Sequence, residues 1–247
     1  MPVVYEKRPS AFGPRVRVSA AQRAPGKPAA SASGDSSPNP DPAPEIVVTR
    51  GKRIYLRTFT RADLGYLDEW AEDPYLDRMV GSEFLSLYKA YEKDASFYDA
   101  VLADPTQIVL MVIPNEDPAR PVGLVRLMNI HQAEGYAGIE TIVADHKASR
   151  RGVGVQASRL MAYYGVDTIG LRRLEAKAYE YNPLSINTLK RNGFTQEGVL
   201  RKAAYRDGRY WDIIVFGILE DEIEEQRRKD KYLLPPDGAE GDGLDTS

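Results

Sequence analysis

The residues best suited to chemistry are two arginines followed by a glycine-rich turn, Arg150-Arg151-Gly152-Val153-Gly154-Val155. Before them, residues 139–144 form an apolar, β-branched run of strand length, and after them residues 155–169 place apolar side chains at helical spacing. A helix start leaves backbone N–H groups without internal partners, and the helix dipole adds partial positive charge. Small residues let an anion approach these groups, and arginine adds full charge. The pattern predicts an anion site suited to a diphosphate.

The same glycines also have a purely conformational interpretation, because a strand-to-helix turn often needs residues that tolerate unusual backbone angles. The run is not a Walker phosphate loop, since no Gly-Lys-Ser/Thr follows it. It also lacks the third glycine of the dinucleotide fingerprint. The anion site is therefore a hypothesis that the surrounding elements must support.

Composition narrows the class of protein. The chain has 247 residues, 43% of them hydrophobic, a net charge of -3 and a pI near 5.6, which favours a packed core and argues against a general nucleic-acid binder. It has no cysteine and two histidines, which excludes disulfides, thiolate zinc sites and a histidine-rich metal site. No apolar run approaches the ~18 residues of a membrane helix, and the first residues lack a secretory signal. We expect a cytoplasmic protein with no metal and no membrane partner.

The chain divides into three parts. Residues 1–45 are rich in Pro, Ala and Ser and carry a basic excess, so we expect a disordered tail. This tail is either a solvated arm or a docking arm for an acidic partner or a neighbouring subunit. Residues 46–219 form the predicted folded domain, and residues 220–247 a charged helix with an acidic tail.

In the first half of the domain, residues 54–59 alternate like a half-buried strand, and Thr60 to Asp63 resembles a capping box. A helix follows and is expected to end at Asp73-Pro74. Residues 84–103 are predicted to form one or two helices, whose aromatic residues belong either to the core or to a wall of the substrate site. Three strands then follow with links too short for crossover helices, which predicts an antiparallel meander: residues 107–113, 122–130 and 136–143.

In the second half, the strand at residues 174–179 follows the central helix, which predicts a parallel strand pair. Asn182-Pro183 is a strong helix start, and Asn192-Gly193 ends that helix. Two strands joined by Asp207-Gly208 form a predicted hairpin, at residues 199–206 and 209–219, and residues 220–231 read as a charged helix.

This order of elements, with Asn182-x-x-Ser185 and Asn192-Gly193-Phe194-x-x-Glu197-Gly198, resembles the GNAT acetyltransferase superfamily. Over residues 46–219 the chain is similar to the branch of RimJ and RimL type, which acetylates N-terminal alanines of ribosomal proteins. Leu56-Arg57, Trp70 with Asp73-Pro74, and Asp207-Gly208-x-Tyr210-x-Asp212 add to this likeness. The resemblance implies an α/β (α+β) fold: a central, mixed, twisted sheet with helices on both faces.

The resemblance also implies acetyl-CoA as cosubstrate. The family loop pattern is Arg/Gln-x-x-Gly-x-Gly/Ala, in which Arg151 and Gly154 fill the first and fourth places and Gln156 stands in the last. The turn should hold the diphosphate, the strand edge should pair with the pantetheine amides, and the asparagine should fix the pantetheine arm. The implied coenzyme-binding residues are Ile142, Val143, Arg150, Arg151, Gly152, Val153, Gly154, Val155 and Asn182. Helix capping by the asparagine and core packing by the strand residues are compatible alternatives.

The implied reaction is direct attack of an amine on the acetyl thioester, which needs a base and a donor for the departing thiolate. Many relatives place a tyrosine seven residues after the asparagine, where this chain has Leu189. Ser185 is the plausible substitute, as in RimL-like enzymes, and would act by hydrogen bonding. Its alternative role is to support the helix start.

The base is less defined. Some RimL-like relatives carry a carboxylate just before the residue that corresponds to Tyr205, where this chain has Ala204. Glu140, on the strand before the turn, is then the best carboxylate, and its alternatives are a structural role or a water chain without a dedicated base. Asp212 and Glu197 match branch positions, where structural roles are equally credible.

The leading expectation is an N-acetyltransferase that acts on a protein N-terminal α-amine. Small-molecule amines (aminosugar, polyamine or antibiotic) are the enzymatic alternative, and Lys202, Arg206 and Arg209 suit an acidic target better than a polycation. A non-catalytic acyl-CoA-sensing module is the alternative suggested by the apolar Leu189 and Ala204. A homodimer stays open.

Overall fold

The computed structural model describes residues 45–145, 148, 151–230 and 233. The predicted basic tail, apart from Glu45, and the predicted acidic tail lie outside these residues, as does Arg150. No helix in these ranges is long and apolar enough to cross a membrane.

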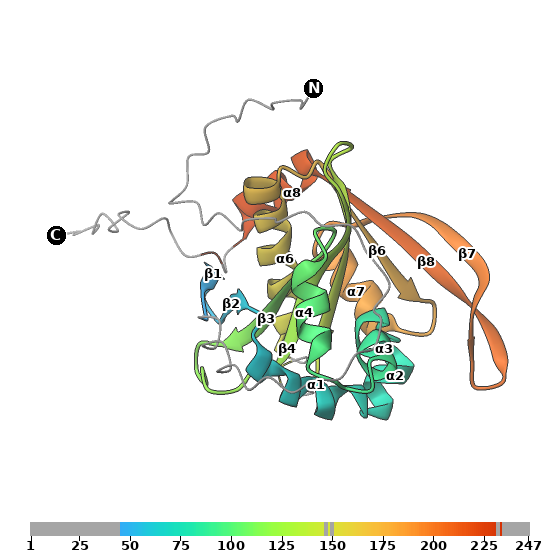
Figure 1. Cartoon of the computed structure of the whole chain (residues 1–247). Helices are drawn as coiled ribbons and strands as arrows, with labels where there is room; N and C mark the ends of the chain where they lie inside the picture. The colour runs from blue at the N-terminus through green and yellow to red at the C-terminus, as the bar shows by residue number, and fades with distance from the viewer. Residues whose placement is uncertain (1–44, 146–147, 149–150, 231–232, 234–247) are drawn as a thin grey trace, which may run out of the picture.

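The centre of the described structure is an eight-stranded sheet in the order β1-β2-β3-β4-β5-β6-β8-β7 (Figure 1). Its neighbours pair antiparallel except β5 and β6, which pair parallel. The predicted meander and the predicted parallel pair are therefore confirmed. The strands are β1 (Val47–Arg50), β2 (Ile54–Thr58), β3 (Ile108–Pro114), β4 (Gly123–His131), β5 (Tyr136–Val143), β6 (Arg173–Tyr179), β7 (Thr195–Arg206) and β8 (Arg209–Leu219).

Helices cover both faces of the sheet, as Figure 1 shows, which confirms the predicted mixed α/β fold. One face carries the 3₁₀ turn η1 (Arg61–Asp63), α1 (Leu64–Ala71), α2 (Pro74–Met79), α3 (Glu83–Ala90) and α4 (Ser96–Ala103). The other face carries α6 (Val153–Tyr164) with its π-helical extension η2 (Gly165–Ile169), α7 (Pro183–Arg191) and α8 (Glu220–Lys229). The helix start predicted at Asn182-Pro183 and the tight turn at Asp207-Gly208 are both observed.

Three local expectations need correction. Asp73-Pro74 does not only end α1: the Asp73 carboxylate accepts a hydrogen bond from the Tyr75 N–H at 2.8 Å, so the same pair begins α2. Strand β7 begins at Thr195, earlier than residue 199, because its pairing with β8 continues across a bulge between Gln196 and Gly198. Strand β1, which pairs with β2, was not predicted at all.

The aromatic residues of α3 and α4 belong to the core. Phe84 and Phe97 pack edge to face with ring centroids 5.1 Å apart, and Tyr88 lies against Phe97 at the same distance. All three are almost fully buried, and only Tyr91 of this group reaches solvent. These helices are therefore fixed on the sheet by aromatic packing, which is worth more than area burial alone.

A buried ion pair joins β2 to the first helical turn. The Arg57 guanidinium donates to both carboxylate oxygens of Asp63 at 2.7 Å, and Asp63 also accepts from the backbone N–H and the hydroxyl of Thr60. The side chains of the ion pair are 7% and 1% exposed. The capping box predicted from the sequence is thus present and carries a buried charge that needs its partner.

Asp63→Ala is expected to lower the free energy of unfolding by about 3–5 kcal/mol, because it removes the two-oxygen partner of the buried Arg57 guanidinium and leaves only the exposed Glu45 carboxylate, 3.5 Å away. Urea denaturation followed by circular dichroism measures this loss. The matched control is Asp99→Ala, whose carboxylate pairs with Arg61 at the surface and should change the midpoint little. Equal midpoints for the two variants would contradict a stabilising role for the buried pair.

Candidate active site

The sheet opens between β5 and β6. Their parallel pairing is limited to Tyr136–Arg173, Ala137–Leu174 and Gly138–Glu175. Beyond this point β5 remains paired with β4, and β6 remains paired with β8 as far as Tyr179–Ile213. The residues of β5 from 139 to 143 therefore have no partner strand on the β6 side in the described part of the chain. An edge of this kind offers backbone N–H and C=O groups to a ligand.

We call the opening between β5 and β6 the wedge. Two helices begin at its open end, since α6 follows β5 and α7 follows β6 in the chain. Gly152 lies just before α6 in the left-handed region, with φ of 77°, and no side chain caps the helix start. The N–H groups of the first turn are then available to an anion. A Cβ built on Gly154 would lie 3.3 Å from Val143 Cγ2, so the turn packs tightly on the end of β5.

The Arg151 side chain pairs with the loop between β3 and β4. The Arg151 guanidinium pairs with the exposed carboxylate of Glu116 at 2.5 Å, and the Arg151 carbonyl accepts from Arg53 at 2.9 Å. Gln156 is buried beneath the turn, where a Cβ on Gly51 would come within 3.1 Å of its side chain. The glutamine that replaces the usual small residue therefore does not cover the turn. An anion at this turn would therefore depend on the backbone N–H groups.

Asn182 and Ser185 form one hydrogen-bonded unit at the start of α7. The Asn182 side-chain oxygen accepts from the Ser185 N–H at 3.1 Å, and its Nδ2 donates to Ser185 Oγ at 2.8 Å and to the Met79 carbonyl at 2.7 Å. Asn182 is buried and Ser185 is half-buried. Because Ser185 Oγ accepts a hydrogen bond, its own proton remains available for donation.

Aromatic residues at and just after the end of β6 contact the end of α2. Tyr181 Oη donates to the Arg78 carbonyl at 2.8 Å, and Tyr179 packs so close to Gly81 that a Cβ there would lie 2.3 Å from the Tyr179 hydroxyl. Tyr181 stacks on Tyr179 and meets the edge of Trp211 on β8. Burial raises the pKa of Tyr181, so the phenol stays protonated. This cluster was not expected from the sequence, in which the run of aromatics after residue 178 is the signal for it.

Glu140 lies on β5 directly opposite Arg126 of β4, and Arg126 Nε donates to its carboxylate at 2.6 Å. The Arg126 guanidinium also lies over the Phe84 ring, which places the pair on the sheet face covered by α1–α4. The Glu140 side chain is 15% exposed. Among the described residues no hydrogen bond joins Glu140 to Ser185, so the structure does not bring the two predicted catalytic residues into direct contact.

The other candidate carboxylates have structural partners. Asp212 accepts from the Lys202 backbone N–H at 2.8 Å, inside a bulge of β7. Glu197 pairs with Arg173, whose hydrogen bonds lower the Glu197 pKa. Leu189 and Ala204 are buried and apolar.

Comparisons with known proteins agree with this geometry. The family model described as "Acetyltransferase (GNAT) domain" matches residues 53–195. The mouse alpha/beta-tubulin-N-acetyltransferase 9 is 27% identical over 223 residues, which cover 78% of this chain and 91% of that protein. The spermidine N(1)-acetyltransferase of Escherichia coli K12 is 24% identical over 184 residues, covering 74% and 95%.

Among solved structures, the spermidine N-acetyltransferase of Vibrio cholerae in complex with CoA and spermine superposes with a TM-score of 0.62 at 19% identity. The match covers 69% of this chain and 98% of that one, and it shows the fold. None of these relatives is a RimJ or RimL enzyme, so the narrower resemblance stays a prediction. With more than half of the chain matched by the family model, the chain belongs to the GNAT acetyltransferase family and is an N-acetyltransferase.

Proposed function

We propose that this protein binds acetyl-CoA in the wedge between β5 and β6 and transfers the acetyl group to a protein N-terminal α-amine by direct attack. The observation that carries the proposal is the interrupted β5–β6 pairing next to an uncapped helix start. The Vibrio cholerae enzyme of the same fold was solved in complex with CoA, which supports the same ligand class.

The donor set fits this cosubstrate. Backbone N–H groups from Gly152 to Val155 suit the diphosphate, and the free β5 edge at Ile142 and Val143 suits the amides of the pantetheine arm. Asn182 already uses its amide within the protein, so we assign it the positioning of Ser185 and of the α2 end. Bound acetyl-CoA would supply the activated thioester.

Ser185 is the proposed donor to the departing sulfur. Asn182 Nδ2 donates to Ser185 Oγ and so orients it, which leaves the hydroxyl proton of Ser185 free to point toward the wedge. This available proton also argues against the purely sensing module, since the apolar Leu189 does not leave the site without a donor.

Glu140 remains the proposed proton acceptor, through the carboxylate oxygen that Arg126 does not bind. A general base contributes about 10²–10⁴-fold to a rate. A Glu140→Gln variant with wild-type kcat at neutral pH would assign the proton to ordered water instead.

Two classes of acceptor are candidates, a protein and a polyamine. The tubulin-named relatives favour a protein acceptor, and the exposed cations of the β7–β8 hairpin repel a polycation. The spermidine-named relatives favour a polyamine. We place the protein acceptor first, because like charges close to a substrate site weaken its binding.

The direct test is CoA release measured with α/β-tubulin, peptides with free N-termini and spermidine, each followed by mass spectrometry. We expect acetylation at the α-amine of a protein or peptide. Turnover with spermidine alone would show that the acceptor is a polyamine and not a protein. Tight acetyl-CoA binding without turnover of any acceptor would support the non-catalytic acyl-CoA-sensing module.

Gly152→Glu is expected to lower acetyl-CoA affinity by about tenfold or more, because it places a carboxylate where the diphosphate should lie. Isothermal titration calorimetry measures the affinity. Gly170→Glu is the matched control, since Gly170 is also left-handed with open space around its Cα but lies beyond the far end of α6. Equal acetyl-CoA affinities for the two variants would contradict binding of the diphosphate at this turn.

Ser185→Ala is expected to reduce kcat about a hundredfold with little change in the KM for acetyl-CoA, because a donor to the leaving group is lost while the wedge is retained. Asn187→Ala, an exposed position on the same helix, is the control. Steady-state kinetics measure kcat and KM for each variant, and melting curves that match the wild type exclude a loss of folding as the cause. Wild-type kcat in Ser185→Ala would rule out the assignment.

A further inference from the structure

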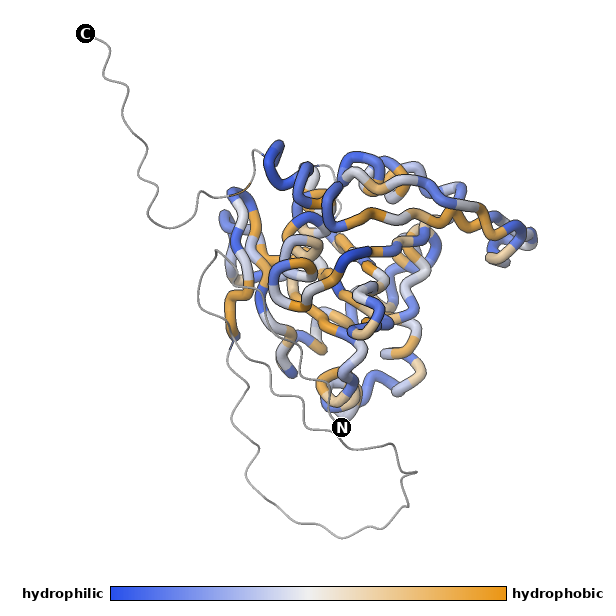
Figure 2. Tube along the Cα trace, turned by 90° about the horizontal axis from the view of Figure 1, so that it is seen from above, coloured by the Kyte–Doolittle hydropathy of each residue, from blue (hydrophilic) through white to orange (hydrophobic). Residues whose placement is uncertain are grey.

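The hairpin of β7 and β8 extends beyond the rest of the sheet, as Figures 1 and 2 show. Its outer part, residues 199–212, carries four cations and two carboxylates in a chain whose net charge is -3. We refer to this part as the hairpin tip. The hairpin tip is therefore net positive on a chain whose overall charge is negative, so its local field differs in sign from what the overall composition suggests.

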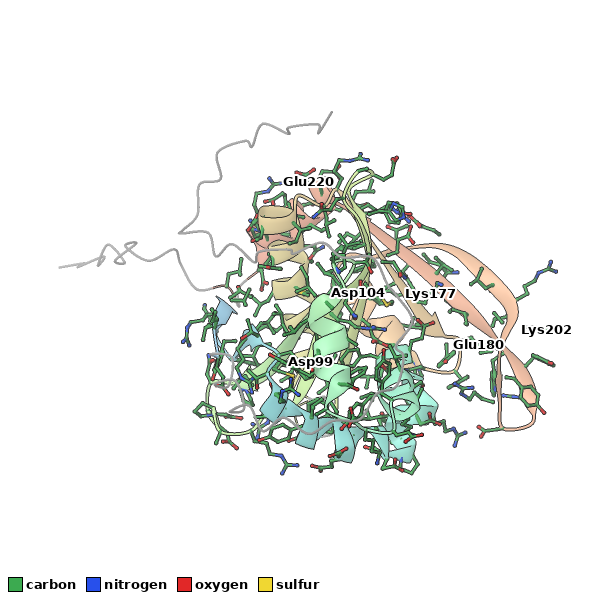
Figure 3. The ribbon with its side chains drawn as sticks, viewed as in Figure 1. Asp99, Asp104, Lys177, Glu180, Lys202 and Glu220 are labelled. Carbon is green, nitrogen blue, oxygen red and sulfur yellow. The ribbon has the colours of Figure 1, made fainter. Side chains whose placement is uncertain are left out.

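Both carboxylates of the hairpin tip are already engaged. Asp207 pairs with Arg78 of α2 at 3.1 Å, and Asp212 accepts from the backbone of Lys202. By contrast, the exposed side chains of Arg201 and Lys202 have no acidic partner among the described residues. Figure 3 shows Lys202 projecting away from the body of the protein. The tip therefore presents uncompensated positive charge to solvent.

Exposed aromatic rings accompany these cations. Tyr205 and Tyr210 lie opposite each other with ring centroids 5.0 Å apart and are 57% and 64% exposed. The Arg209 guanidinium stacks on Trp211 at 3.3 Å from the ring centroid. Tyrosine, tryptophan and arginine are enriched among the residues that contribute most to protein–protein binding, and the two aromatic types bury much area at low entropic cost.

The tip is also held in place before any partner arrives. The bulge between Leu200 and Ala204 puts Lys202 at φ of 52°, and the Asp212 carboxylate satisfies its free N–H. The Arg78–Asp207 ion pair ties the turn to α2. A pre-organised surface loses less entropy on binding than a mobile loop.

We propose that the hairpin tip docks an acidic segment of the acceptor protein, so that the enzyme recognises its substrate beyond the reacting amine. This inference rests on the proposed protein acceptor and deepens it. Charge complementarity selects the partner: unpaired Arg and Lys attract Asp and Glu side chains, and the exposed tyrosines supply contact area and hydroxyl donors.

The test measures binding without chemistry. Fluorescence anisotropy follows a labelled, N-terminally acetylated peptide of glutamate, glycine and tyrosine, with no acetyl-CoA present, against the full chain. A matched peptide has glutamine in place of glutamate. The variant is Arg201→Glu with Lys202→Glu, and the control is Arg228→Glu with Lys229→Glu, which makes the same charge change on the exposed end of α8.

We expect the wild type and the α8 variant to bind the glutamate peptide equally, and the hairpin variant and the glutamine peptide each to lose about tenfold in affinity. Unchanged binding by the hairpin variant would overturn the proposal. Tighter, hairpin-dependent binding of single-stranded RNA than of the peptide would assign the tip to nucleic acid and also overturn it. Because the peptide is blocked and acetyl-CoA is absent, this result is independent of whether acetylation of any acceptor is found.

Discussion

The parallel pairing of β5 and β6 ends after three residue pairs, and the rest of the site depends on this interruption. Beyond these pairs each strand stays paired on its other side, β5 with β4 and β6 with β8. The two halves of the sheet can therefore twist apart without losing their own hydrogen bonds. Backbone groups left inside the wedge need partners from solvent or a ligand. The opening thus creates a binding edge within an otherwise continuous sheet.

The helices turn this edge into a site. Both α6 and α7 begin at the open end, so their N–H groups and dipoles are directed to the same region. The start of α6 has no side-chain cap and can receive an anion, whereas Asn182 caps α7 and positions Ser185. A helix start thus leaves backbone N–H groups uncapped in α6, whereas in α7 it orients a hydroxyl.

The proposed acceptor side combines segments that are far apart in the chain. Residues Tyr179, Tyr181 and Asn182 contact the end of α2, and Arg78 of α2 reaches Asp207 at the hairpin turn. Hydrogen bonds and a ring contact thus join the start of α7 to the end of α2, and one ion pair joins α2 to the hairpin turn. The Arg78–Asp207 ion pair is exposed, so we expect it to hold the hairpin turn near α2 only weakly.

Local chemistry in the sequence was enough to predict several features: the glycines at 152 and 154 indicated a strand-to-helix turn, Asn182-Pro183 a capped helix start, and Asp207-Gly208 a tight turn. These features depend on backbone angles and hydrogen bonds within a few residues, which side-chain type largely controls. The end of the β5–β6 pairing, the Arg126–Glu140 ion pair and the turning of Arg151 toward Glu116 instead join residues distant in sequence. No local pattern encodes such pairings, because they result from the packing and twist of the whole sheet. The sequence therefore determined which groups were available for binding and chemistry, and only the tertiary structure decided which of them meet.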